Sequence, residues 1–295
     1  MRGLREKPAG VLRGKRLVVA FLCVAAVFAG LWGLTELLDE ISRRQTLEQP
    51  EPQQQEQPSN PLQPGIIEGL AKNPYDLTQF SKIGGVITYL GQKSFVGVDV
   101  SSHQQEIDWN KVKADGVEYA MIRVGYRGYT QGKLEEDIQF RSNIEGALAA
   151  GLKVGVYFFS QAISETEARE EAQFVLDRIR DYDVTYPVIF DWENIEADAR
   201  TDGMDPNTLT QCAAAFCQEI EAAGYRPGLY FNQVFGYQQF NLVDLQDYEF
   251  WLAQYSDVPD FYYNFHMWQY TNEGIIDGIE GQVDLNLSFV DYAGG

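Results

Sequence analysis

Apolar, β-branched runs alternate with amphipathic segments along most of the chain, and this rhythm constrains the fold more than any other feature. Such alternation is typical of parallel βα units. It predicts strands near residues 95–101, 119–125, 153–160, 186–192, 227–232, 249–255, 265–271 and 282–287. The region is short for a complete (β/α)8 barrel, which typically needs ~250 residues. An incomplete barrel is therefore expected.

Helix signals occupy the gaps between the earlier strands. Ser164 and Glu167 have the spacing of a capping box, and Asp205 followed by Pro206 is typical of an N-cap and a first helical residue. The helical pattern fades after the fifth strand, where connections such as SDVPDFYYNF are short or irregular. The predicted fold class is α/β, an incomplete TIM-like barrel of about (β/α)5(β)3 over residues 94–291.

The N-terminal region has a different composition from the barrel. Residues 1–16 are basic, and an uncharged apolar run from Leu17 to Leu34 predicts a transmembrane helix over residues 17–38. The basic segment predicts a cytoplasmic N-terminus, so the barrel would lie outside the cell. The alternative is secretion after cleavage of a signal peptide, although the run is longer than the ~7 to 15 residues usual for one.

Two segments separate this helix from the barrel. Residues 39–75 are rich in Gln, Pro and Glu, and predict an extended linker because they contain too little apolar surface to fold. Residues 76–93 form a lead-in segment in which GGVITYLGQ is interpreted as a short hairpin.

Charge and cysteine content narrow the classes of partner. The chain has 43 acidic and 23 basic residues and a formal net charge of -20, which argues against nucleic acid as a partner and is compatible with a neutral, sugar-like ligand. Cys212 and Cys217 are five residues apart on an expected helix, so they point about 140° apart and are interpreted as core thiols. No cysteine or histidine spacing indicates a metal, and no cofactor is expected.

The stretch YPVIFDWENIE ends an apolar strand with two carboxylates. Residues two apart on a strand point to the same side, so Asp191 and Glu193 share one face and Trp192 takes the other. Asp99 ends the first strand and Asp284 lies in the last, and these two strands become neighbours when a barrel closes. Crowded carboxylates raise at least one pKa and keep a proton available, as glycosidic bond cleavage requires.

This interpretation has an alternative, in which Asp191 and Glu193 cap the strand or hold a metal. Aromatic side chains near the predicted strand ends favour a saccharide site, since their faces pack against sugar rings. These residues are Tyr126, Tyr157, Tyr230, Trp251, Tyr255, Trp268 and Tyr270.

Several motifs also resemble those of a known family. GVDVSSHQQEIDW, MIRVGYRG, KVGVYFFSQ, YPVIFDWE, GLYFN, FWLAQY and MWQYTNEGIIDGIEGQVDLN resemble, in this order, glycoside hydrolase family 25, the Chalaropsis-type lysozymes or N-acetylmuramidases. The resemblance covers about residues 94–290. It implies hydrolysis of the β-1,4 bond between N-acetylmuramic acid and N-acetylglucosamine in peptidoglycan.

The resemblance also implies roles for individual residues. Glu193 would be the acid/base, Asp191 its partner, and Asp99 and Asp284 the aspartates of the first and last strands. The implied reaction retains configuration, with the substrate's N-acetyl group attacking and Asp191 stabilising the charged intermediate. The implied groove residues are Tyr157, Tyr230, Trp268, Arg123 and Asn232. Gln105 is a departure, because glycine is frequent at this position in the family.

Two other functions stay open on the sequence alone. One is a cell-wall-binding protein that has lost turnover, although four retained carboxylates argue against it. The other is a chitinase-like barrel glycosidase, but no acid occurs between Pro187 and Phe190, where the longer acidic signature of that group would lie.

Overall fold

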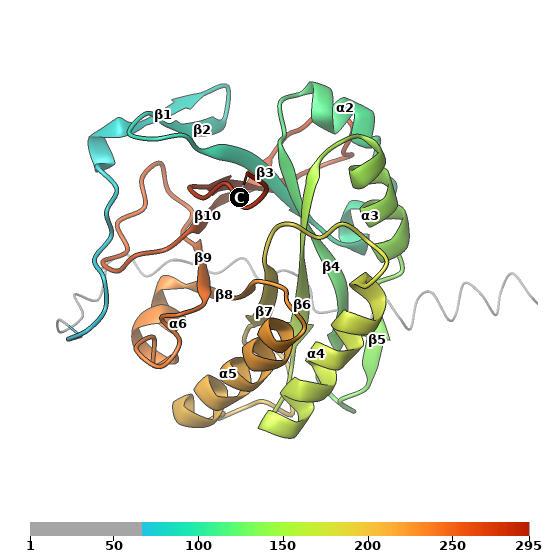
Figure 1. The fold of residues 1–295 in the computed structure, drawn as a ribbon, viewed down its shortest axis with the longest axis vertical. Helices are drawn as coiled ribbons and strands as arrows, with labels where there is room; N and C mark the ends of the chain where they lie inside the picture. The colour runs from blue at the N-terminus through green and yellow to red at the C-terminus, as the bar shows by residue number, and fades with distance from the viewer. Residues whose placement is uncertain (1–66, 295) are drawn as a thin grey trace, which may run out of the picture. The chain divides into compact units, whose positions relative to one another are not determined.

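Eight strands close into a barrel in the computed structural model, which describes residues 67–294 (Figure 1). The strands β3 and β4 pair with each other, and β11 pairs with β3, so the ring is complete. All eight predicted strands are confirmed. They are β3 (Phe95–Val100), β4 (Tyr119–Arg127), β6 (Lys153–Ser160), β7 (Val188–Trp192), β8 (Pro227–Asn232), β9 (Glu249–Ala253), β10 (Met267–Gly274) and β11 (Val283–Ser288).

Strand direction departs from the expected parallel pattern at one point. Neighbouring strands from β3 through β10 run parallel, whereas β11 is antiparallel to both β10 and β3. The cause is the short connection of residues 275–282, because a parallel crossover needs about a dozen or more residues. A further short strand that the sequence did not predict, β5 (Leu134–Glu136), pairs antiparallel with the end of β4.

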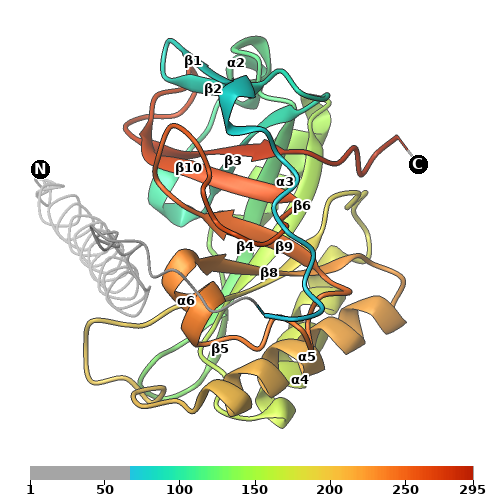
Figure 2. The ribbon, with the colours of Figure 1, turned by 90° about the vertical axis from the view of Figure 1, so that its left-hand side faces the viewer.

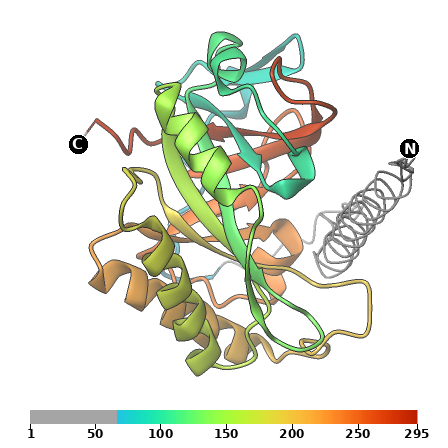
Figure 3. The ribbon, with the colours of Figure 1, turned by 90° about the vertical axis from the view of Figure 1, so that its right-hand side faces the viewer.

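One α-helix follows each of the first five barrel strands, in agreement with the sequence pattern. The helices are α2 (Trp109–Ala114), α3 (Phe140–Ala149), α4 (Glu165–Ile179), α5 (Pro206–Ala222) and α6 (Gln233–Gln238). Within residues 67–294, no α-helix separates β9, β10 and β11. Figure 3 shows α3 lying over β4 and β6, with α4 and α5 side by side.

The two predicted helix starts are confirmed in the contacts of their first residues. Ser164 Oγ accepts a hydrogen bond from the backbone N–H of Glu167 at 3.3 Å, and the Asp205 carboxylate accepts one from Thr208 N–H at 3.0 Å. The carboxylate of Glu167, however, accepts from Ile163 N–H at 3.1 Å rather than from Ser164 N–H. Only half of the expected capping box is therefore present.

The lead-in segment contains a hairpin that packs on the outside of the barrel (Figure 2). Its strands are β1 (Phe80–Ile83) and β2 (Val86–Tyr89). The turn residues Gly84 and Gly85 have φ values of 62° and 90°, the conformation that glycine adopts most readily in two-residue hairpins. The ring of Phe80 meets that of Trp268 edge-on with centroids 5.4 Å apart, which covers part of the outer face of β10.

Residues just before the hairpin also contact the barrel. Asn73 Nδ2 donates to the backbone oxygen of Phe261 at 3.0 Å, and Tyr75 Oη donates to the backbone oxygen of Phe265 at 2.7 Å. The last part of the predicted linker therefore packs against the folded domain. The predicted transmembrane helix at 17–38 lies outside the described residues, and within 67–294 no helix is long and apolar enough to cross a membrane.

Successive side chains of each barrel strand point alternately inward and outward, so the domain has two hydrophobic cores. An inner cluster inside the barrel contains Tyr119, Met121, Ile189, Trp251 and Met267, while a larger outer cluster lies between the strands and the helices. On β7, Asp191 and Trp192 therefore point in opposite directions, and Trp192 packs outward against Phe235 with ring centroids 5.7 Å apart. Cys212 and Cys217 are free and buried on α5, as expected for core thiols.

Candidate active site

The four carboxylates predicted from sequence lie at one end of the barrel. Asp99 is near the end of β3, Asp191 is the second-to-last residue of β7, and Glu193 follows β7 directly. Asp284 is near the start of β11, where it stands opposite Asp99 in the antiparallel ladder. The ends of the parallel strands and the start of the reversed strand meet here, so residues far apart in sequence share one site.

Electrostatic interactions link Asp99 to each of the other three carboxylates. Burial raises the pKa of Asp99 to about 6. Burial also raises the pKa of Glu193, and with the negative charge of Asp99 this pKa reaches about 7. The pKa values of Asp191 and Asp284 are raised well above the ordinary range, first by burial and then by the neighbouring carboxylates. The four carboxylates together therefore retain at least one proton near neutral pH.

Two amide side chains hold Asp99 in place. Asn286 Nδ2 and Gln269 Nε2 donate to its Oδ2 at 2.7 and 2.9 Å, and both contacts lower the pKa of Asp99 against the effect of burial. The indole Nε1 of Trp251 donates to Asn286 Oδ1 at 2.8 Å, which fixes that amide in turn. These bonds orient one oxygen of Asp99 inside the barrel.

Sequence reasoning did not identify Gln269 or Asn286. Both lie on inward positions, two residues after Met267 and Asp284 respectively. A polar side chain at an inward position of a buried strand is unusual, and this is the signal that would have indicated them. Gln269 Oε1 also accepts a hydrogen bond from the phenolic hydroxyl of Tyr230 at 2.9 Å.

Asp191 lacks such support. Its Oδ1 is buried and has no hydrogen-bond partner among the residues the structure describes. A buried polar atom without a partner costs free energy, so Asp191 Oδ1 has an unused capacity to accept a hydrogen bond within the site. The positive charge of Arg123 lowers the pKa of Asp191, opposing the larger effect of burial.

The structure brings two of the predicted groove residues to the carboxylates. Tyr157 lies on the inward side of β6 with its ring edge-on to Trp251, centroids 6.0 Å apart. Tyr230 lies on β8 and meets Trp251 at 5.0 Å. Burial raises the pKa of both phenols well above the ordinary value, with contributions from Asp99 and Asp191, so both hydroxyls stay protonated.

Arg123 is buried beside the site and is engaged by a carboxylate. Its Nε and Nη2 lie 2.8 and 2.7 Å from Asp137 Oδ2, and Nη2 donates to Ser102 Oγ at 3.2 Å. The backbone N–H of Ser102 donates to the same Asp137 oxygen at 3.0 Å. The Arg123–Asp137 pair thus fastens the loop that follows Asp99.

Asn232 caps a helix, and Trp268 lies on the outward face of its strand. Asn232 Oδ1 accepts from Phe235 N–H at 2.9 Å and caps the start of α6. Trp268 points outward from β10, is fully buried under the hairpin, and donates from Nε1 to the backbone oxygen of Gln254 at 2.8 Å. The structure therefore does not bring Trp268 to the carboxylates.

Gln105 stands in the loop that follows Asp99. It has a φ of 55°, and among the described residues it is the only one other than glycine with a positive φ. This conformation favours glycine, which accounts physically for the frequency of glycine noted at this position. Within residues 67–294, no group of three or more His, Cys, Asp or Glu side chains is arranged to hold a metal ion.

Comparisons with known proteins match the barrel. The family model described as Glycosyl hydrolases family 25 matches residues 98–279. An autolytic lysozyme of Clostridium acetobutylicum is 26% identical over 191 residues, covering 64% of this chain and 54% of that protein. Lysozyme M1 of Streptomyces globisporus is 26% identical over 203 residues, covering 64% and 66%. The chain spans about half the length of the first of these relatives.

Solved structures give the same fold. The modular autolysin LytC from Streptococcus pneumoniae, in complex with a synthetic peptidoglycan ligand, aligns with a TM-score of 0.59 and 25% identity over 71% of this chain and 52% of that one. A bacterial lysozyme from Streptomyces coelicolor aligns with a TM-score of 0.54 and 22% identity, covering 68% and 94%. The second likeness concerns the fold alone.

Proposed function

The chain belongs to glycosyl hydrolases family 25, and we propose on this premise that it is a peptidoglycan hydrolase. The bond cleaved is the β-1,4 linkage between N-acetylmuramic acid and N-acetylglucosamine. Relatives named as lysozymes, and a neighbour solved with a peptidoglycan ligand, support this choice of substrate. The architecture proposed with it is the incomplete TIM-like barrel, (β/α)5(β)3.

One observation carries the proposal: Glu193 combines a pKa of about 7 with a position beside three other carboxylates. A carboxyl with this pKa is protonated in a large fraction of molecules near neutral pH, and it is a strong enough acid to donate to a leaving oxygen. A wall-binding protein without turnover has no need for such a group, since the burial of several acids costs stability.

The proposed reaction assigns one role to each of two acids. Glu193 donates its proton to the glycosidic oxygen as the C1–O bond breaks, and the substrate's N-acetyl oxygen forms a bond to C1. Asp191 stabilises the positive charge that develops on the acetamido group. Glu193 then takes a proton from water, whose oxygen bonds to C1 and displaces the acetyl oxygen with net retention.

The surrounding side chains supply binding and orientation. Asp99 contributes negative charge that helps to keep the proton on Glu193 before bond cleavage, and Asp284 stands opposite Asp99 in the ladder. Tyr157 and Tyr230 offer aromatic faces and hydroxyl groups to the sugar rings, and Arg123 balances the charge of Asp191. Asn232 belongs to this set through its place at the end of β8, although its side chain also caps α6.

The proposed location is the outer face of the cell membrane. Residues 17–38 would anchor the chain, with residues 1–16 in the cytoplasm and the linker holding the barrel near the wall. Secretion after signal cleavage is the alternative. Protease treatment of intact cells distinguishes the two, because only the anchored form leaves an N-terminal fragment in the membrane.

Digestion of purified peptidoglycan tests the activity. The full-length chain should release muropeptides with new reducing muramic acid ends, detected by borohydride reduction and mass spectrometry, and Glu193→Gln should release none. Exposed Glu196→Gln is the matched control and should digest as the wild type does. Binding to wall material without products would favour a binding protein, and cleavage of chitin oligosaccharides alone would favour a chitinase.

A further inference from the structure

The backbone of Glu193 is held by a side chain that has no part in the reaction described above. Gln161 follows β6 directly and is fully buried. Its Nε2 donates to the backbone oxygen of Glu193 at 3.0 Å and to that of Ser160 at 3.0 Å. One amide group thereby connects the end of β6 to the residue that follows β7.

The loop that leaves the site returns to the same glutamine. Thr201 Oγ1 donates to Gln161 Oε1 at 2.7 Å, and Arg200 Nη1 donates to the backbone oxygen of Gln161 at 2.8 Å. Both residues lie in the connection between β7 and α5, downstream of Glu193. Gln161 therefore fixes this connection at its first residue and again near its end.

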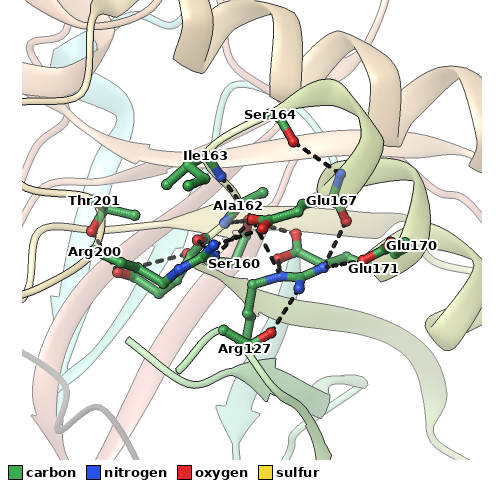
Figure 4. A network of polar contacts seen from close by, with 12 residues as sticks. Arg127, Ser160, Ala162, Ile163, Ser164, Glu167, Glu170, Glu171, Arg200 and Thr201 are labelled. Atoms are coloured by element: carbon green, nitrogen blue, oxygen red, sulfur yellow. Dashed lines mark hydrogen bonds and ion pairs between the residues drawn. The ribbon is translucent and has the colours of Figure 1, made fainter. Parts of the chain in front are cut away.

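Arg200 is itself locked to α4. Its Nη1 and Nη2 lie 2.7 and 2.6 Å from the two carboxylate oxygens of Glu167, a bidentate pair that is mostly shielded from solvent. Figure 4 shows this pair beside a second group of charges around Arg127. A bidentate pair defines the direction of the guanidinium as well as its distance, so it fixes the loop geometry.

The second group of charges anchors the end of β6, from which Gln161 extends. Arg127 Nε donates to Glu171 Oε1 at 2.7 Å, and Ser160 Oγ donates to Glu171 Oε2 at 2.6 Å (Figure 4). Glu171 is fully buried, and burial raises its pKa to about 7 even beside Arg127. Such a network is costly to bury, which is reasonable where a nearby residue needs a fixed position.

We propose that Gln161, held by Thr201 and Arg200, is a positioning residue that sets the orientation of the Glu193 carboxyl. This inference rests on the proposed function of Glu193 as the acid/base. We call Gln161, Thr201, Arg200 and Glu167 the Gln161 clamp. Among these contacts, the clamp reaches Glu193 through its backbone oxygen.

The physical reason is geometric. Glu193 lies just beyond the last residue of β7, so the sheet ladder does not hold it in the way that it holds Asp191. A hydrogen bond to its backbone oxygen restricts the peptide that follows and with it the direction of the side chain. A general acid displaced by about 1 Å can lose about 100-fold in rate, so a fixed peptide at this position has a direct effect on turnover.

Isosteric variants of Thr201 test the clamp without touching Glu193. Thr201→Val removes the hydroxyl that fixes the Gln161 amide, and Thr201→Ser keeps it. Gln161→Met is the second variant, since it retains the side-chain volume and loses all three hydrogen bonds of the Gln161 amide. Arg169→Ala is the control, because it removes an α4–α5 ion pair with Glu219 at 2.8 Å that lies outside the clamp.

Two readouts are taken on the full-length chain. The first is the steady-state rate on peptidoglycan, where Thr201→Val and Gln161→Met should lower kcat by about tenfold or more and leave KM within about twofold. The second is the titration of the Glu193 carboxyl by ¹³C NMR, assigned through the signal lost in Glu193→Gln. The pKa should fall from about 7 towards 4.5 in both variants as the carboxyl turns to solvent. Thr201→Ser and Arg169→Ala should match the wild type in both readouts.

Each result bears on one claim. Wild-type kcat and wild-type Glu193 titration in Thr201→Val and Gln161→Met, with only a lower Tm, would overturn the inference. Loss of folded protein in both variants would also overturn it, because the clamp would then be an element of folding. If the wild type itself releases no muropeptides, the proposed function fails, and the NMR titration alone still decides whether Gln161 controls Glu193.

Discussion

Replacement of Glu193 by Gln should stabilise the protein in alkaline solution while it abolishes turnover. The pKa of this carboxyl rises from an ordinary 4.5 to about 7 in the folded chain, mainly through burial. The folded state therefore binds the proton more tightly than the unfolded state does. The contribution to stability is fully present below about pH 4.5 and is lost as the pH rises through about 7. Glutamine does not titrate, so the variant escapes this loss.

The expected magnitude follows from the two pKa values. At about 1.4 kcal/mol for each pH unit between them, the wild type loses about 3 kcal/mol by pH 8. Glu193 is partly exposed to solvent and its pKa depends on the charge of Asp99, so a gain of about 1 to 3 kcal/mol is expected for Glu193→Gln at pH 8. For a domain of this size the gain corresponds to a Tm increase of about 3 to 10 °C.

Thermal unfolding followed by circular dichroism at pH 5 and pH 8 measures this effect. The lower pH lies just above the isoelectric pH of about 4.4, and most of the gain should vanish there. Glu196→Gln, three residues along the same loop and exposed, is the control and should change Tm by less than about 2 °C at either pH. An equal change at both pH values, or a loss of stability at pH 8, would refute the assignment of a raised pKa to Glu193.

Three further outcomes follow from contacts in the barrel. Turnover of peptidoglycan should fall about tenfold for each pH unit above about 7 as Glu193 loses its proton, and initial rates that stay level to pH 9 would contradict this. Arg127→Met leaves the Glu171 carboxylate buried without its 2.7 Å partner, and should cost about 3 to 5 kcal/mol in a denaturant titration at pH 8. Trp268→Phe removes the bond to the Gln254 backbone oxygen, and should lower stability by about 1 kcal/mol while turnover stays within about twofold.

The strand positions were predictable because parallel strands in a barrel are buried on both faces. Such strands appear in sequence as nearly continuous apolar runs, for example Val188 to Phe190 in β7. The helix starts were predictable for a local reason, since Ser164 and Asp205 bond to N–H groups only three residues away. Local signals of this kind need no knowledge of the tertiary fold.

Side-chain environment was harder to predict where it depends on distant elements. Trp268 is adjacent to inward Gln269, and a shift of one residue along a strand changes the face that a side chain occupies. Phe80 of the hairpin, which covers Trp268, is 188 residues earlier in the chain, so nothing near the tryptophan signals its burial. Gln161 was missed for a similar reason, because its partners are at residues 193, 200 and 201.

The reversed direction of β11 explains how Asp284 reaches the site. Asp284 is the second residue of its strand, and in a parallel strand that position would lie at the far end of the barrel from Asp99 and Asp191. Because β11 runs antiparallel, its beginning meets the end of β3, and Asp284 stands opposite Asp99 in the ladder. The same reversal places Asn286 two residues further along, within 2.7 Å of Asp99 Oδ2. The short connection of residues 275–282 thus determines the strand direction and, through it, the fourth acid of the site.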